Sequence, residues 1–424
     1  MDKIKVKSID EIIYHEKLDN GLDVYMYPKS GFNTVTANFV TLYGSNDYEF
    51  IPINHDTFKT YPLGIAHFLE HKIFESEDNI NIFDKFEKYG ATVNAYTNHD
   101  VTCYYFSTLK NVNKCLNLLL DFVQAPYFTD ENVEKEKGII NQEISMTGDN
   151  VERFLFERMF HNSFVNLPDR NKTIGSIESI GQITKEDLYE CYNTFYNPSN
   201  MILTIAGDIN VNKILEVVKK NQNKKIFKKE SKIIRKEYKE PIKVYKKYEI
   251  VNKNVSVPRL CLSYKYKIKK LNGLDKYKYS LFLFMLLEMK FSDITSFDKM
   301  LIDEKIINSV LYYYSKILDD FVFMSFETDI IDEEKFIYKI EERLKNQTYD
   351  ENKFNLLKKA YLSSVVRAYD NPSSIASVIF NDIVNYGSFM DCAYNIIKDF
   401  SFDEFCKLSK EIDINNKSII RVEK

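Results

Sequence analysis

Apolar and polar residues in the first half of the chain follow two different periods. Residues 22–27 and 34–42 alternate at every second position and are rich in β-branched side chains, which predicts strands. Residues 62–75 instead repeat their apolar side chains at helical spacing, after a turn signal at Pro62 and Gly64. The same patterns predict further elements, with strands at 92–97, 101–108 and 201–206 and helices over about 79–89, 111–125, 130–147, 150–162 and 184–196.

The order of elements starts again after a lysine-rich stretch. Residues 219–247 carry pairs of adjacent lysines with few apolar residues between them, which is typical of a solvated connection between domains. Beyond it we expect a strand near 257–267, helices near 274–290 and 293–304, strands near 308–316 and 320–328, and then several helices. The prediction is therefore an α+β chain divided into a domain at 1–220, a linker at 221–247 and a second domain at 248–424.

Composition narrows the class of protein. The chain has 424 residues, of which 44% are hydrophobic, and this is enough for two domains of ordinary size. Its net charge of −4 gives no indication of nucleic-acid binding, so a solvated linker is favoured over a basic tether for nucleic acid. The six cysteines show no C-x-x-C pair, which favours a reducing compartment. The polar N-terminus does not resemble a signal peptide, and no stretch approaches the roughly 20 apolar residues that span a bilayer. We expect a cytoplasmic protein without a membrane span.

Residues 67–71 concentrate the candidate chemistry. His67, Glu70 and His71 occupy positions i, i+3 and i+4, which share one face of a helix. Two neutral imidazoles there can bind Zn²⁺, and an unligated carboxylate beside them can take a proton from a water on the metal. This H-x-x-E-H order is the reverse of H-E-x-x-H. The alternative is a helix with two surface histidines and a solvated glutamate.

A catalytic zinc site usually has three protein ligands and an open fourth position, so a third donor is required. Glu136 and Glu143 are the best candidates, because they lie seven residues apart, two turns along one face of the helix predicted over 130–147. Either could be the ligand, with the other in support, and an ordinary charged helix surface is the alternative. All six histidines lie at or before His161, so the second half cannot bind a metal through imidazole.

Three motifs occur in the same order as in a known family of enzymes. They are Gly64-Ile65-Ala66-His67-Phe68-Leu69-Glu70-His71, then Asn94-Ala95-Tyr96-Thr97, then Glu134-Lys135-Glu136-Lys137-Gly138-Ile139-Ile140 with Glu143. With these motifs the chain resembles the pitrilysin or insulinase-type zinc metallopeptidases, the inverzincins, which include the mitochondrial processing peptidases. Phe74-Glu75 and residues 192–200 are most similar to the compact bacterial YfmH-like members.

The resemblance implies a role for each residue of the first and third motifs. In the family, a glutamate somewhat over seventy residues after the second histidine completes the zinc site, and Glu143 lies 72 residues after His71. The acidic position that corresponds to Glu136 supports catalysis from behind the ligands. The resemblance thus implies zinc ligands, a general base and a supporting acid, in this order: His67, His71 and Glu143; Glu70; Glu136.

The resemblance also implies the fold and the way in which substrate binds. Members have two homologous pitrilysin-like domains, each a mostly antiparallel sheet covered by helices. Asn94, Ala95 and Tyr96 correspond to the edge strand beside the zinc, which pairs with an extended substrate by main-chain hydrogen bonds. On their own, these residues equally describe a half-buried strand. The expected activity is zinc-dependent cleavage of extended peptides.

The second half departs from the family in one respect. Single-chain relatives carry an arginine and a tyrosine, seven residues apart, that hold the substrate, but Ile302 and Ser309 occupy these positions. Arg367 and Tyr369 lie too close together, and in the wrong segment, to replace them. We therefore expect a heterodimer with a related subunit that carries this clamp and lacks the zinc motif. The alternative is a non-catalytic subunit of a heteromeric complex of the same superfamily, although an intact Glu70 favours the peptidase.

Overall fold

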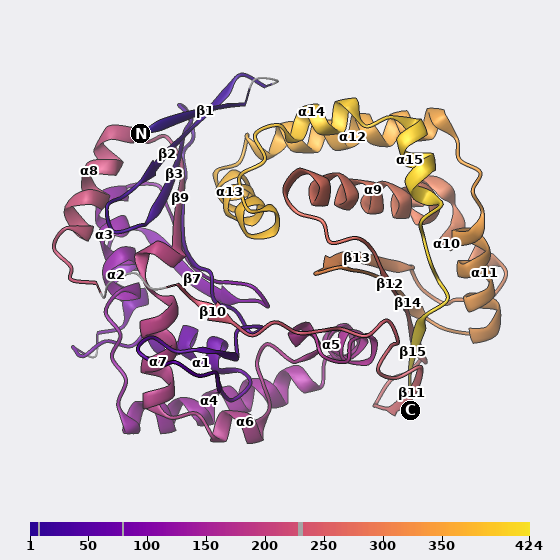
Figure 1. Cartoon of the computed structure of the whole chain (residues 1–424), viewed down its shortest axis with the longest axis horizontal. Helices are drawn as coiled ribbons and strands as arrows, with labels where there is room; N and C mark the ends of the chain where they lie inside the picture. The colour runs from indigo at the N-terminus through magenta and orange to yellow at the C-terminus, as the bar shows by residue number, and fades with distance from the viewer. Residues whose placement is uncertain (7–8, 79, 228–231) are drawn as a thin grey trace. The chain divides into compact units, whose positions relative to one another are not determined.

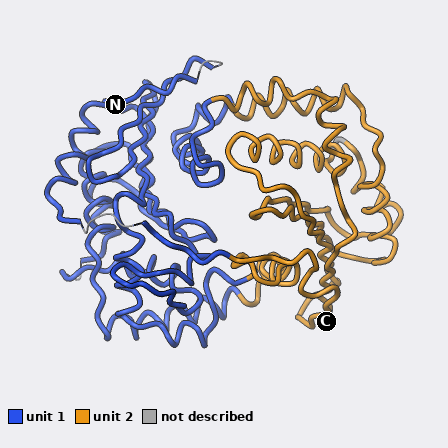
Figure 2. The backbone as a smooth tube through the Cα atoms, in the orientation of Figure 1, with its two compact units in different colours: residues 1–147, 171–237, 366–391 blue, residues 148–170, 238–365, 392–424 orange. Residues whose placement is uncertain are grey.

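The computed structural model describes residues 1–6, 9–78, 80–227 and 232–424. These residues form two compact units, drawn in blue and orange in Figure 2. Unit 1 comprises residues 1–147, 171–237 and 366–391, and unit 2 comprises residues 148–170, 238–365 and 392–424. Each unit therefore contains a segment from the other half of the sequence. The division of the sequence at 220 and 248 stays a prediction, and residues 228–231 of the predicted linker lie outside the described residues.

Unit 1 is built around one large sheet (Figure 1). The strands of this sheet are β1 (Asp2–Val6), β2 (Glu11–Lys17), β3 (Asp23–Pro28), β4 (Val35–Thr41), β7 (Ala91–Thr97), β8 (Thr102–Thr108) and β9 (Met201–Gly207). The short strands β5 (Glu49–Ile51), β6 (Lys59–Thr60) and β10 (Ile234–Arg235) form a separate small sheet. The helices of unit 1 are α1 (Ile65–Ile73), α2 (Ile82–Glu87), α3 (Val112–Val123), α4 (Asp130–Gly148, whose last residue is assigned to unit 2), α6 (Ile177–Gly181), α7 (Lys185–Phe195), α8 (Val211–Gln222) and α13 (Pro372–Tyr386).

Unit 2 is built around a second sheet. Its strands are β11 (Tyr248–Asn252), β12 (Arg259–Lys267), β13 (Tyr312–Leu318), β14 (Phe321–Asp329) and β15 (Lys417–Glu423). Its helices are α5 (Val151–Ser163), α9 (Gly273–Phe291), α10 (Phe297–Asp303), α11 (Glu333–Lys345), α12 (Glu351–Ala368, which ends in unit 1), α14 (Ala393–Asp399) and α15 (Phe402–Ser409). Most predicted elements are confirmed within a few residues, but β1, β2, β11, β15, the short strands β5, β6 and β10, and the helices α6 and α8 were not predicted.

The two main sheets share one arrangement of strands. The unit 1 sheet has the order β1-β2-β3-β9-β4-β8-β7, and the unit 2 sheet has the order β11-β15-β12-β14-β13. The pairs β3–β9 and β11–β15 are parallel, and the remaining pairs of both sheets are antiparallel. Strands β3-β9-β4-β8-β7 therefore match β11-β15-β12-β14-β13 one for one. The predicted pair of similar, mostly antiparallel α+β domains is confirmed.

Helices cover both faces of each main sheet, and one of these helices comes from the other half of the sequence. In unit 1, buried side chains of α1, α3, α7 and α8 pack on one face, and Ile375, Ile379 and Phe380 of α13 pack on the other. In unit 2, α5 takes the place that α13 has in unit 1, with Leu155 and Phe160 packed against β12, β14 and β15. The periodicity of α5 and α13 predicts an apolar face for each helix, but not which sheet covers it.

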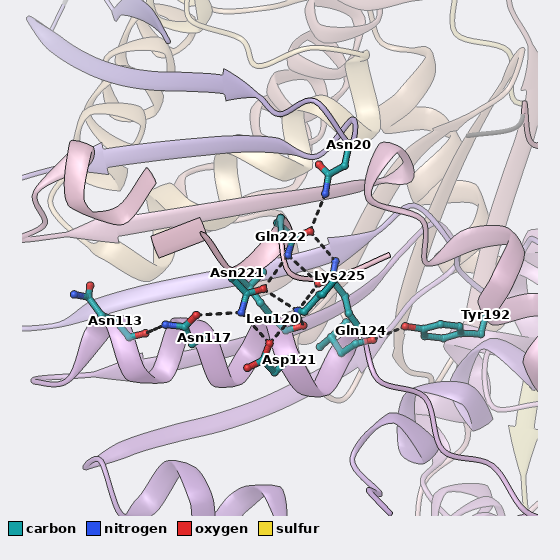
Figure 3. Close-up of polar contacts among 11 residues, drawn as sticks. Asn20, Asn113, Asn117, Leu120, Asp121, Gln124, Tyr192, Asn221, Gln222 and Lys225 are labelled. Carbon is teal, nitrogen blue, oxygen red and sulfur yellow. Dashed lines mark hydrogen bonds and ion pairs between the residues drawn. The ribbon is translucent and has the colours of Figure 1, made fainter. Parts of the chain in front are cut away.

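The lysine-rich stretch is docked at several points instead of being solvated throughout. Figure 3 shows Lys225, whose Nζ donates to the side-chain oxygens of Gln124 and Asn221, each at 2.8 Å. Gln222 donates to Gln124 at 2.8 Å and Asn221 donates to Asp121 at 2.8 Å, so this network joins α3 to α8.

Within the described residues, no helix has the length and apolar character needed to cross a membrane.

Candidate metal centre

Helix α1 begins at a glycine that the surrounding backbone requires. Gly64 has φ of 91°, in the left-handed region, and a Cβ at this residue would lie 2.5 Å from the Ile174 carbonyl oxygen. The predicted apolar face of the helix is confirmed, because Ala66, Leu69 and Ile73 are buried in the unit 1 core. This packing fixes the orientation of the opposite, polar face of α1.

Helix α4 supplies the second wall of the site. Thr129 and Asn132 accept hydrogen bonds from each other's backbone N–H, at 3.1 and 2.9 Å, so the helix begins with a reciprocal cap. Val133 and Ile140 are buried in the unit 1 core. Glu136 and Glu143 continue this face of the helix at heptad spacing, as predicted.

The structure brings His67, His71 and Glu143 together. One ligand atom from each side chain lies within 4.8 Å of the other two, and among the described residues this is the group that could hold a metal ion. The Glu143 Oε2 atom lies 3.8 Å from His67 Nε2 and 3.6 Å from His71 Nε2. Two donors at tetrahedral angles around one zinc ion lie about 3.4 Å apart. The donor set and its spacing therefore fit Zn²⁺.

Glu136 lies behind His71 instead of beside the three donors. Its Oε1 atom is 3.0 Å from His71 Nδ1, so the ring turns its other nitrogen toward Glu143. Burial opposes ionisation of Glu136, but the hydrogen bond and charge of His71, together with the charge of Lys72, lower its pKa below the ordinary value. Burial also opposes charge on His71, and the contact with Glu136 outweighs it and raises the pKa of His71. A carboxylate in this position orients a metal-binding histidine.

Glu70 contacts strand β7, whereas Glu136 contacts His71 from helix α4. The side chain of Glu70 is buried and accepts a hydrogen bond of 2.7 Å from the Thr97 hydroxyl. Burial raises the pKa of Glu70, and the hydrogen bond from Thr97 offsets part of this effect. The Thr97 hydroxyl also lies 3.2 Å from that of Thr102, on β8. Glu70 is thus a carboxylate that is held in place and is separate from the three possible ligands.

The predicted substrate strand, β7, is the last strand of its sheet. The Asn98 N–H donates to the Val101 carbonyl at 2.9 Å in the turn to β8, so the backbone of Asn98 faces β8. Because this direction alternates along an antiparallel strand, the backbone groups of Asn94 and Tyr96 also face β8. The N–H and C=O groups of Ala95 point away from β8, toward the free edge of the sheet, and the N–H donates to the Asn94 side-chain oxygen at 2.8 Å.

The positions that correspond to the family's clamp show no equivalent groups. Ile302 is an exposed side chain on α10, and the Ser309 hydroxyl lies 3.5 Å from that of Thr328. Tyr369 is buried in unit 1, where its ring packs edge-on against Tyr27. Arg367 is exposed at the end of α12. Tyr369 is therefore a core residue and cannot serve as a replacement.

Two residues that contact the site were missed in the sequence. Thr97 was included in the second motif but received no role, although it shares a strand face with Ala95, two residues earlier. Lys72 follows His71 directly and received no role, but its position on the apolar stripe of α1 was a signal. A buried lysine requires an acidic partner, and Lys72 contacts both Glu75 and Glu136.

Comparison of the sequence with protein families gives two matches that cover most of the chain. Residues 59–177, which contain His67, His71 and Glu143, match the model described as insulinase, peptidase family M16. Residues 182–361 match the model described as the peptidase M16 inactive domain. The first match therefore includes the candidate metal centre, and the second includes most of unit 2.

Comparisons with individual proteins agree with the two family matches. The chain is 38% identical to the uncharacterized zinc protease YmfH of Bacillus subtilis, over 88% of each chain. It is 29% identical to the beta subunit of mitochondrial-processing peptidase of Rattus norvegicus, over 48% of this chain and 40% of that protein. A crystal structure of an M16-like protein from Alicyclobacillus acidocaldarius matches 97% of each chain with a TM-score of 0.90 and 30% identity.

Proposed function

Because the chain belongs to the insulinase family of peptidases, family M16, we propose that it is a zinc metalloendopeptidase that cleaves extended peptides. The observation that carries this proposal is the convergence of His67, His71 and Glu143 beside the separate carboxylate of Glu70. A zinc site with a purely structural role has no use for such a base. A non-catalytic subunit is the second candidate, and it would leave the contact between Thr97 and Glu70 without a function.

The side chains divide the chemistry between them. His67, His71 and Glu143 would hold the metal, and Glu136 would keep His71 in the required tautomer. Zinc in such a site polarises a carbonyl oxygen and lowers the pKa of a water to about 7. Glu70 would accept the proton of the attacking water and deliver it to the leaving amine, and Thr97 would keep the Glu70 carboxylate in position.

The free edge of β7 would hold the substrate. An extended peptide can add to this edge and bond to the backbone groups of Ala95, while Asn94 and Tyr96 stay paired with β8. Main-chain bonds do not depend on side-chain identity, so peptides of varied sequence would bind, and pockets nearby would set the preference. The side chain of Ala95 is small and leaves this edge open to an approaching backbone.

Metal analysis combined with a cleavage assay tests the function. The purified chain should contain one zinc per molecule, and a chelator should abolish cleavage of unstructured peptides, with recovery when zinc is restored. A chain that binds zinc and cleaves no peptide, alone or with a related partner, would favour the non-catalytic subunit. A chain that binds no zinc would contradict the peptidase function.

The proposal includes a partner. Relatives of this chain are named as subunits of mitochondrial-processing peptidase, and Ile302 and Ser309 supply no clamp for a substrate backbone. We therefore propose a heterodimer with a related chain that carries the arginine and the tyrosine and lacks the zinc motif. Poor anchoring leaves the reacting carbonyl loosely placed, so the chain alone should be a weak catalyst. Sedimentation with activity measurements checks this, and efficient cleavage by a monomer or homodimer would contradict the heterodimer.

A further inference from the structure

Lys72 carries a fully buried ammonium group next to the candidate metal centre. The residue follows His71 on α1, and its side chain is 0% exposed. Its Nζ lies 2.6 Å from Glu75 Oε2, donates to the Asn132 carbonyl at 3.0 Å, and lies 3.7 Å from Glu136 Oε2. Removing an ammonium group from water is costly unless it is paired and hydrogen-bonded, so these contacts fix its position.

The contacts of Lys72 on α4 lie on successive turns of that helix. Asn132 is part of the reciprocal cap at the start of α4, and Glu136 comes four residues later. The two carboxylate oxygens of Glu136 contact two neighbouring residues of α1. Oε1 lies 3.0 Å from His71 Nδ1, and Oε2 lies 3.7 Å from Lys72 Nζ. One side chain of α1 thus links the start of α4 with the carboxylate that orients a metal-binding histidine.

We propose that Lys72 is a positioning residue of the metal centre, which fixes the Glu136 carboxylate and the first turns of α4 so that His71 and Glu143 converge. A glutamate has three rotatable bonds, and one hydrogen bond to a histidine ring does not fix all of them. The ammonium group of Lys72 supplies the second anchor. The inference rests on the zinc site of the proposed function, but not on peptide cleavage.

A purely structural ion pair is the competing explanation, and zinc affinity separates the two. Zinc binding to the full-length chain is measured by competition with a chelating indicator, together with thermal unfolding of the zinc-free chain. Lys72→Met removes the charge, and Lys72→Gln is a milder variant that keeps a donor for the Asn132 carbonyl. Both should weaken zinc binding roughly ten- to a hundred-fold, the range found when partners behind metal ligands are removed.

Lys265→Met is the matched control. Lys265 is also 0% exposed and pairs with a buried glutamate, Glu240, at 2.8 Å, but the pair lies in unit 2. Its loss should lower the midpoint of thermal unfolding and change zinc affinity less than roughly two-fold, because it acts on no ligand support. If the Lys72 variants lower only the unfolding midpoint, as Lys265→Met does, Lys72 has no positioning role.

A double-mutant cycle tests whether Lys72 acts through Glu136. In a Glu136→Gln chain, Lys72→Gln should weaken zinc binding far less than it does in the wild type, because the carboxylate that it anchors is gone. If the double variant weakens zinc binding by the product of the two single effects, Lys72 does not act through Glu136. A wild-type chain that binds zinc tightly but cleaves no peptide would contradict the proposed function and leave this test intact. Unchanged zinc affinity in both Lys72 variants would overturn the positioning role, whatever the activity.

Discussion

The two units build different chemistry on the same arrangement of strands. Between β4 and β7, unit 1 has α1, with His67, Glu70 and His71 on one face, whereas unit 2 has α9 between the matching strands β12 and β13, and α9 contains no histidine. After the fourth matched strand, unit 1 has α4 with its two inward glutamates, whereas the only acidic residue of α12 is Glu351, at its first position. The difference shows that the candidate metal centre depends on a few side chains of two helices, and not on the sheet beneath them.

A buried lysine in each unit gives a second difference between the two units. Lys72 in unit 1 and Lys265 in unit 2 are both fully buried, and each contacts a buried glutamate. In unit 1 that glutamate also contacts His71, whereas in unit 2 Glu240 accepts backbone hydrogen bonds from residues 165–167, at 2.8, 2.7 and 2.9 Å. The same pair of residue types therefore supports a site in one unit and holds the segment after α5 in the other.

The largest expected effect separates the two glutamates of α4. Glu143→Ala should abolish measurable zinc binding, because it removes one of three ligands. Glu136→Ala should weaken zinc binding by roughly ten- to a hundred-fold, since it removes only the support of His71. Zinc titration of both variants checks this. Tight zinc binding by Glu143→Ala, with loss in Glu136→Ala, would exchange the two roles.

In unit 2, breaking the buried pair should affect stability and leave the metal centre intact. Glu240→Gln leaves Lys265 charged, buried and without its counter-ion, which should reduce the free energy of unfolding by about 3–5 kcal/mol. Denaturant unfolding measures the loss, and zinc titration of the same variant should match the wild type. A loss of zinc affinity in Glu240→Gln would contradict the separation of roles between the units.

Acid should weaken unit 2 through a second carboxylate. Glu249 accepts from Arg158 at 2.7 Å, and this bond, with further bonds from Asn162 and Lys246, lowers the pKa of Glu249 from 4.5 to about 2. Because the folded pKa is the lower one, the contribution is present above pH 4.5 and is lost as the pH falls through about 2. Arg158→Met should cost about 1.5–3 kcal/mol at pH 7. In unfolding measurements, its difference from the wild type should shrink toward pH 2, and a constant difference would contradict this assignment.

The smallest effect tests the substrate edge of β7. Ala95→Pro removes an N–H that donates to the Asn94 side chain and not to β8, so the sheet should tolerate it, while kcat/KM should fall up to roughly ten-fold through loss of one hydrogen bond to the substrate. Tyr96→Pro is the matched control, because its N–H faces β8 and its loss should destabilise the sheet. Cleavage assays and thermal unfolding of both variants are compared. Equal effects of the two prolines on folding would show that the edge is assigned incorrectly.

The sequence predicted the parts of the site that rest on local pattern. The histidine face of α1 and the two glutamates of α4 follow from helical spacing. Helical spacing alone did not show which glutamate joins the histidines, and the resemblance to a family indicated Glu143. Thr97 and Lys72 were missed because their partners, Glu70 and Glu136, lie on other elements, and a local pattern does not show which elements pack together.

The fold was likewise predictable where it follows from the local pattern of apolar and polar residues. Strands with strict alternation, such as β3 and β4, were found, whereas β1 was missed because charged residues alternate with its few apolar ones in a half-exposed edge strand. The exchange of α5 and α13 between the units was not predictable. Each helix has an ordinary apolar face, and the choice of sheet is made by tertiary packing alone.

Glu70→Gln, measured beside the wild type, tests whether Glu70 is the general base. The substitution keeps the shape of the side chain and removes the base, and Glu70 contributes none of the three ligand atoms. Zinc content should therefore stay at one per chain, while turnover of a peptide substrate should fall by roughly two orders of magnitude or more. Full activity of a zinc-loaded Glu70→Gln chain would contradict the assignment of Glu70 as the base, and with it the proposed mechanism.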